Sequence, residues 1–246
     1  ITILPSAPVG KALILLFILA PFATVLTNGD ALYFEMRTIQ GMKIYDSVAS
    51  VANQAIVLLP FFLGRRYLGT PEGTRAVLVA LVAGGVAYSV PMLIEARFSP
   101  QMNIWVYGFF QHDFFQTIRQ GGFRPVVFLQ HGLWVAFFTL MALLAALAML
   151  RDAPAAARPR AAAILIYLFY MLLVCKSAGP LVYLVSLSPL LVFVGSRVQI
   201  LVAAGLAALV IIYPILRGAH LVPLERILDF ATSFSADRAY SLQFRI

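Results

Sequence analysis

Long apolar runs recur along the whole chain and restrict its fold more than any other feature. A membrane-spanning helix needs about 20 mostly apolar residues, and about seven such runs can be counted. They cover residues 8–26, 44–63, 76–94, 126–150, 161–175, 178–194 and 200–216. Of the 246 residues, 62% are hydrophobic and 11% are charged, against about 45–50% and about 25% in soluble domains. We predict an all-α, polytopic transmembrane bundle of about seven spans.

The same composition excludes a secreted soluble enzyme, a disordered chain and a disulfide scaffold. The mean hydropathy of +0.92 is too high for the first two classes, and a single cysteine, Cys175, cannot form an internal disulfide. The net charge of +8 comes from short basic clusters between apolar runs. We interpret these clusters as topology determinants, and we expect no nucleic-acid partner. Zinc, P-loop and dinucleotide patterns are absent from the sequence, so we expect neither a metal nor a cofactor.

The whole chain, residues 1–246, is predicted to form one transmembrane domain. Its fifth and sixth apolar runs are short and are divided by Lys176-Ser177, so they form either a tight hairpin or one broken helix. The sequence opens with Ile1 rather than Met and stops just after an Arg-bearing segment. We therefore expect it to be part of a longer protein, and residues 217–246 to begin a large loop.

Basic residues between the runs predict the orientation, because Lys and Arg accumulate on the cytoplasmic side. One side receives Lys11, Arg65, Arg66, Arg75, Arg151, Arg158, Arg160 and Arg197. The other side receives residues 30–43, residues 95–125, the Lys176 turn and the tail from Arg217. We expect a multi-pass protein of the bacterial inner membrane with a cytoplasmic N-terminus and long periplasmic segments, where function tends to concentrate.

The segment after Glu95 has an amphipathic pattern. Phe110, Phe114 and Ile118 recur every four residues, which predicts a periplasmic helix lying in the membrane surface and ended by Gly121-Gly122. His112 and Asp113 would lie on the wet face of this helix. At the start of the segment, we expect Glu95 to pair locally with Arg97, and the alternative is that they contact a substrate.

Two arginines follow this pattern and predict an anion site. Arg124 precedes Pro125, and Pro125 suits the first turn of the fourth span. Arg124 would then lie at a helix N-terminus, where the helix dipole favours anions, with Arg119 one Gly-Gly turn away. Such a site fits a phosphate or pyrophosphate headgroup. The alternative is that both arginines extend to lipid headgroups without binding a substrate.

Other polar residues extend this hypothesis. His131 would lie about two turns inside the fourth span, where a titratable group is a functional candidate or a hydrogen-bonded packing residue. Lys176 either reaches the interface or binds an anion. One helix face would carry Arg238, Ser241 and Arg245. These residues would either complete a site that binds a polyanion or form a solvated surface.

These residues resemble a known family. Four features are similar to those of the O-antigen ligase and O-antigen polymerase family. They are the R-x4-R-P motif from Arg119 to Pro125, the GGFRPVVFLQHG segment, the Lys176-Ser177 turn and the R-x2-S-x3-R tail. The resemblance covers most of the chain as ordered features. The family usually carries Ser-Arg-Gly at the turn where this chain has Lys176, Ser177, Ala178 and Gly179.

The resemblance implies a metal-independent GT-C-type glycosyltransferase of exopolysaccharide or lipopolysaccharide biosynthesis. Its donor would be a polyprenyl-pyrophosphate-linked glycan. Arg119, Arg124, Arg238 and Arg245 match the family's pyrophosphate-binding arginines. The family's histidine base would lie beyond this chain, so His131 does not inherit that role and the catalytic residue stays unassigned.

Two other classes compete with this hypothesis. A non-catalytic subunit or scaffold of a larger membrane complex would contact lipids and partner proteins, and its arginines would face headgroups without converging. A lipid-carrier transporter would usually show repeats and midplane polar residues, whereas this sequence shows no repeat and places most of its charges at the interfaces. Convergence of the arginines in one cavity would favour the enzyme.

Overall fold

The structure is a computed structural model that describes residues 3–34, 37–119, 121–219, 221, 222, 224, 229, 232 and 233. The chain divides into two compact units, Ile1–Leu181 and Val182–Ile246. The second unit contains most of α7 (Ala178–Phe193) and all of α8 (Ser196–Gly218). Each unit is described by itself.

In the part of the chain that the structure describes, five helices are long and apolar enough to cross a membrane. They confirm the predicted helical fold and support the prediction of a multi-pass membrane protein. They are α1 (Pro8–Thr27), α2 (Ile44–Tyr67), α3 (Pro71–Phe98), α5 (Gly132–Arg151) and α8. The two short apolar runs form α6 (Arg158–Val174), of 17 residues, and α7, of 16 residues. The total of seven spans therefore stays a prediction. Residues 175–177 separate α6 from α7, and Lys176 there has a φ of 48°.

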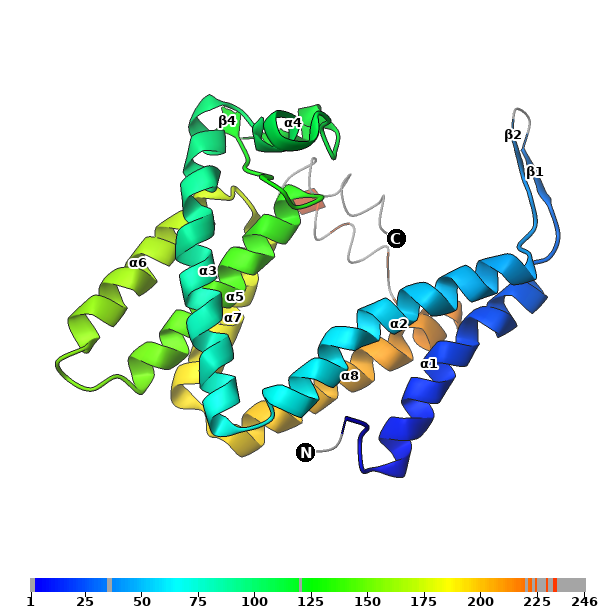
Figure 1. Ribbon diagram of the computed structural model, residues 1–246, viewed down its shortest axis with the longest axis horizontal. Coiled ribbons are helices and arrows are strands. Elements are labelled where there is room, and N and C mark those ends of the chain that lie inside the picture. Colours follow the sequence, from blue (N-terminus) through cyan, green and yellow to red (C-terminus); the bar gives the residue numbers. More distant parts are fainter. Residues whose placement is uncertain are drawn as a thin grey trace. The chain divides into compact units, whose positions relative to one another are not determined.

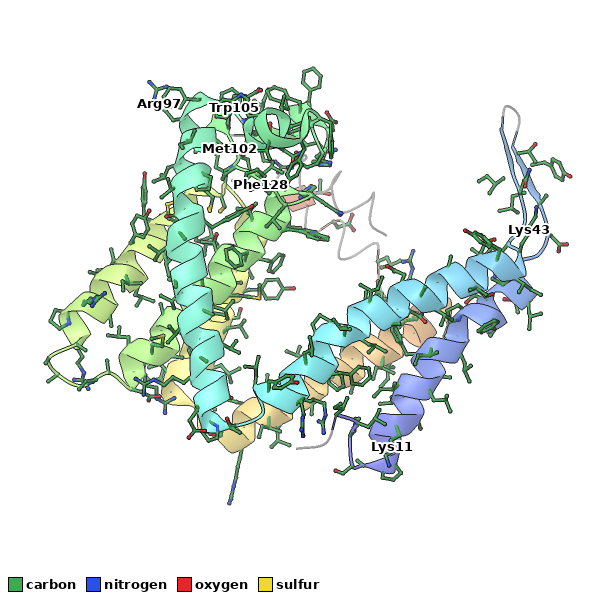
Figure 2. The ribbon with its side chains drawn as sticks, viewed as in Figure 1. Lys11, Lys43, Arg97, Met102, Trp105 and Phe128 are labelled. Carbon is green, nitrogen blue, oxygen red and sulfur yellow. The ribbon has the colours of Figure 1, made fainter. Side chains whose placement is uncertain are left out.

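Helices α1 and α2 pack against each other and are joined by a short hairpin (Figure 1). Its strands are β1 (Leu32–Phe34) and β2 (Arg37–Ile39), paired antiparallel with Leu32 opposite Ile39. Figure 2 shows Lys11 and Lys43 at opposite ends of this helix pair. That the two lysines lie on opposite sides of the membrane stays a prediction.

Helices α3, α5 and α6 form the best-packed part of the chain. Their buried core contains Met92, Val127, Val135, Ala136, Met171 and Cys175. Gly85 of α3 faces Ala142 of α5 so closely that a Cβ at position 85 would lie 2.5 Å from the Ala142 Cβ. Small residues permit this approach, as they do in other membrane helix pairs.

The three helices alternate in direction. The end of α3, the start of α5 and the end of α6 meet, because Glu95 bonds Val126 and Arg124 bonds Ser177. Figure 1 shows α4 (Met102–Tyr107) and β4 (Gly122–Phe123) at this same end of α3. We call residues 99–131 the cap segment. The arginines assigned to the cytoplasmic side, Arg75, Arg151, Arg158 and Arg160, belong to the opposite ends of these helices.

The predicted surface helix over residues 110–120 is wrong. The cap segment instead contains a 3₁₀ turn (Phe114–Thr117) and a hairpin of β3 (Ile118–Arg119) and β4. Gly121, with a φ of 67°, lies in the hairpin turn instead of ending a helix. The ring of Phe114 lies 5.8 Å from the Phe110 ring and 6.2 Å from the Phe123 ring. The apolar residues thus pack around the hairpin, so their four-residue spacing did not report a helix.

The predicted start of the fourth span is also wrong, because α5 begins at Gly132 and not near Pro125. Val127 has a φ of 53°, which a β-branched residue rarely adopts. The backbone N–H groups of residues 126 and 127 donate to Glu95, so they are not available to a helix. His131 is consequently the N-cap of α5, and it does not lie two turns inside that helix.

Candidate functional site

Glu95 anchors the cap segment to the end of α3. The residue is 1% exposed. One oxygen accepts the Met102 N–H at 3.0 Å, and the other accepts the N–H groups of Val126 at 2.8 Å and Val127 at 2.7 Å. The expected local pair with Arg97 is therefore wrong, since the Arg97 guanidinium lies over the Phe98 ring instead. Three backbone donors satisfy the buried charge better than one exposed arginine.

Arg124 is a buried cation. Its side chain is 4% exposed, and its Nη2 donates to Ser177 Oγ at 2.7 Å. Its backbone N–H donates to the Thr117 carbonyl at 2.7 Å, so the residue is fixed at both ends. The side chain crosses Gly132, where a Cβ would lie 2.6 Å from Nε. Arg124 thus lies beside the start of α5 as predicted, although the helix does not begin at Pro125.

The charge of Arg124 is left largely uncompensated by the residues that the structure describes. Among them, Nε is buried without a hydrogen-bond partner, and no carboxylate pairs with this guanidinium. Burial, and after it the charge of Arg119, lower the pKa of Arg124 to about 10. The side chain therefore remains a cation at neutral pH. Such a group is costly to bury, which is why an anion would bind there favourably.

Lys176 brings a third cation to the same place. The left-handed backbone at Lys176 follows the end of α6, and its Nζ donates to the Arg119 carbonyl at 3.0 Å. The ammonium lies against Gly122, where a Cβ would be 2.6 Å from Nζ. An ammonium has three donors, so two remain for a ligand after the bond to Arg119.

We call Arg119, Arg124 and Lys176 the cation cluster. Arg119 is exposed, Lys176 is half-buried and Arg124 is buried, so positive charge extends from the surface into the protein. Three cations around a surface of lowered dielectric favour a polyvalent anion. Sequence reasoning named all three residues, and the structure brings them together. Arg238, Ser241 and Arg245 lie outside the described residues.

The cap segment also contains a cavity of about 640 Å³ that sequence reasoning missed. We call it the histidine cavity, and its lining comprises Asn103, Tyr107, Phe109, Gln111, His112, Phe128, Gln130, His131 and Trp134. The rings of His112 and His131 lie 4.4 Å apart. The available signal was a Gln-His pair that occurs twice, at 111–112 and at 130–131. His112 was assigned instead to the wet face of a helix that does not form.

The described part of the chain holds no cluster of three or more His, Cys, Asp or Glu side chains suited to a metal ion. Comparison with known proteins identifies no relative: no family model, no curated protein and no solved structure matches the chain.

Proposed function

We propose that the protein is a membrane glycosyltransferase that binds a polyprenyl-pyrophosphate-linked glycan through the cation cluster. The buried charge of Arg124 is the observation that carries this proposal. It has a hydroxyl partner at Ser177 but no carboxylate partner in the described chain. A polar or charged group buried near a membrane is expensive and usually has a functional partner.

The position of the cluster suits a lipid-linked anion. The cluster lies at the end of α3, α5 and α6 that is opposite the arginine-rich loops, and those loops indicate the cytoplasmic side. A polyprenyl chain would remain in the bilayer while its pyrophosphate reaches the exposed Arg119 and the half-buried Lys176. Arg124 would supply positive potential from behind them.

The chemistry requires charge stabilisation at this place. In glycosyl transfer the bond between the anomeric carbon and the pyrophosphate oxygen breaks, and the leaving group takes the electron pair. The acceptor hydroxyl forms the new bond and gives its proton to a base. Cations fixed around the leaving group stabilise its growing charge. The proposal of an O-antigen ligase or polymerase rests on the sequence resemblance, and the base is unassigned.

The test measures binding of a sugar-free polyprenyl pyrophosphate to the protein in lipid nanodiscs. Lys176→Met and Arg119→Met each remove a charge, and the Arg119 variant keeps the carbonyl that accepts from Lys176. We expect each to raise the Kd about tenfold, which corresponds to about 1.4 kcal/mol. Matched controls are Lys43→Met and Arg97→Met, which remove a charge outside the cluster and should leave the Kd within about twofold.

A second readout is the release of polyprenyl pyrophosphate from a lipid-linked glycan when an acceptor is added. Binding without release would support a non-catalytic lipid-binding subunit. Equal loss of binding in the cluster variants and the control variants would refute a specific site, because it would reflect general attraction between cations and anionic lipids.

A further inference from the structure

The histidine cavity adjoins the cation cluster. His131 lines the cavity and directly precedes Gly132, the residue that the Arg124 side chain crosses. Figure 2 shows Phe128, which lines the cavity, near the same end of α3 as Met102 of α4. A ligand held by the cluster would therefore have the cavity beside it.

The lining combines two kinds of group. Aromatic rings are available to a ligand, since Tyr107 is 62% exposed and Trp134 is 55% exposed. Amides and imidazoles come from residues 103, 111, 112, 130 and 131. A pyranose ring presents C–H groups that pack on an aromatic face, and hydroxyls at its edge that both donate and accept. The volume lies within the range of about 300–1,000 Å³ for small-molecule sites.

The two imidazoles lie side by side at the cavity, with their ring centroids 4.4 Å apart. Leu133 N–H donates to His131 Nδ1 at 2.9 Å, and His112 Nε2 lies 3.1 Å from the side-chain oxygen of Gln116. The two rings thus bring polar nitrogen atoms to the cavity lining, where hydroxyl groups could contact them.

Other ligand classes fit this cavity less well. Among the described residues its lining contains no lysine or arginine, in contrast to the cation cluster, so these lining residues do not select a phosphate. A hydrocarbon chain would cover the exposed amide of Gln130 without offering it a hydrogen-bond partner. An adjoining cavity of about 510 Å³ suits a hydrocarbon chain better, because its lining is almost entirely apolar: Tyr88, Leu129, Trp134, Phe137, Phe138 and Met141. Trp134 is common to both cavities.

We propose that the histidine cavity binds a pyranose ring of a glycan. The inference rests on the proposed function for the statement that this ring belongs to a pyrophosphate-linked glycan or its acceptor. Binding of a sugar to the cavity itself needs no phosphate. Tyr107 and Trp134 provide the packing faces, and Gln130 and the two histidines provide polar contacts.

The test uses tryptophan fluorescence in lipid nanodiscs. The chain has two tryptophans, and Trp105 is not among the residues that line the cavity. A Trp105→Phe protein therefore reports from Trp134 alone. It is titrated with glucose, galactose, N-acetylglucosamine and their disaccharides. We expect a saturable change in emission for at least one sugar, with a Kd on the order of 1 mM.

Lining variants and matched controls are made in the same Trp105→Phe protein. Tyr107→Ala and Gln130→Ala should raise the Kd about fivefold or more, and Tyr33→Ala and Gln40→Ala should leave it unchanged. The reciprocal Trp134→Phe protein, with Trp105 as reporter, should show a smaller response. If a lining variant fails to fold, the sugar titration of the Trp105→Phe protein still shows whether a sugar binds beside Trp134.

Three results would overturn the inference. The first is that no sugar up to about 100 mM changes the tryptophan emission of the folded protein in a saturable way. The second is an equal change in emission from the two tryptophan reporters. The third is that inorganic pyrophosphate, and not sugar, gives the saturable change. The sugars carry no phosphate, and the probe of the proposed function carries no sugar. Failure of the cavity and failure of the cation cluster are thus observed separately.

Discussion

Lys176 Nζ donates to the carbonyl oxygen of Arg119 at 3.0 Å, across 57 residues of sequence. This bond ties the β3–β4 hairpin to the end of α6. A second tie runs from the Arg124 N–H to the Thr117 carbonyl, at the base of the same hairpin. The cation cluster is therefore assembled by contacts within the cap segment and by contacts from it to the turn after α6. Both include main-chain atoms that most substitutions leave in place.

Substitution of Glu95 should destabilise the cap segment. Glu95→Gln leaves one acceptor oxygen where the carboxylate oxygens accept three N–H groups, and it places an amide donor near backbone donors. We expect a loss of about 3 kcal/mol in the free energy of unfolding, measured by SDS titration with circular dichroism. Glu72→Gln, at an exposed position in the first turn of α3, should cost less than about 1 kcal/mol. Equal effects would contradict the anchoring role.

Removal of the Ser177 hydroxyl should cost stability and release Arg124. Ser177→Ala deprives a buried guanidinium of its bond at 2.7 Å. We expect a loss of about 2 kcal/mol in the free energy of unfolding. The matched control is Ser186→Ala, whose exposed hydroxyl bonds only within its own helix and should change stability by less than about 0.5 kcal/mol. If Ser177→Ala left the free energy of unfolding unchanged, the position of Arg124 would not depend on this hydrogen bond.

The glycine at the start of α5 should tolerate no side chain. In Gly132→Ala the new Cβ would lie 2.6 Å from Arg124 Nε and 2.9 Å from Cδ, so the arginine must move. We expect a loss of about 1–3 kcal/mol in the free energy of unfolding, together with weaker binding of polyprenyl pyrophosphate. Gly205→Ala, where nothing lies within 4 Å, should be neutral or stabilising by up to about 1 kcal/mol. Unchanged pyrophosphate binding by Gly132→Ala would argue against a precise role for Arg124.

Labelling of single cysteines should place the cap segment and the α5–α6 loop on opposite sides of the membrane. Cys175 is buried and is replaced by alanine. Phe115→Cys then reports on the cap segment, and Ala156→Cys on the loop between α5 and α6. Both positions are exposed. A membrane-impermeant thiol reagent added to intact cells should label position 115, and position 156 should react only after permeabilisation. The reverse labelling pattern would mean that the predicted orientation is inverted. Labelling of positions 115 and 156 from the same side would refute the prediction that they lie on opposite sides of the membrane.

Sequence patterns predicted the helices well because helix formation in a membrane is local. A spanning helix satisfies its own backbone hydrogen bonds, so a long apolar run is sufficient evidence for it. The cap segment was predicted poorly for the opposite reason. Its apolar spacing resembled a helix, but its backbone donors find partners elsewhere, such as Glu95, which lies 31 residues before Val126.

The candidate site likewise has one part that the sequence predicted and one part that it did not. The identities of Arg119, Arg124 and Lys176 followed from the sequence, because a charged residue beside an apolar run is conspicuous and costly. The histidine cavity did not, because His112 and His131 are 19 positions apart and become neighbours only when the cap segment folds over the start of α5. The sequence alone thus determined which segments are helical and apolar enough to cross a membrane, and which side each basic loop should favour. Only the tertiary structure decided which polar residues meet, because those contacts depend on hydrogen bonds and packing between distant segments.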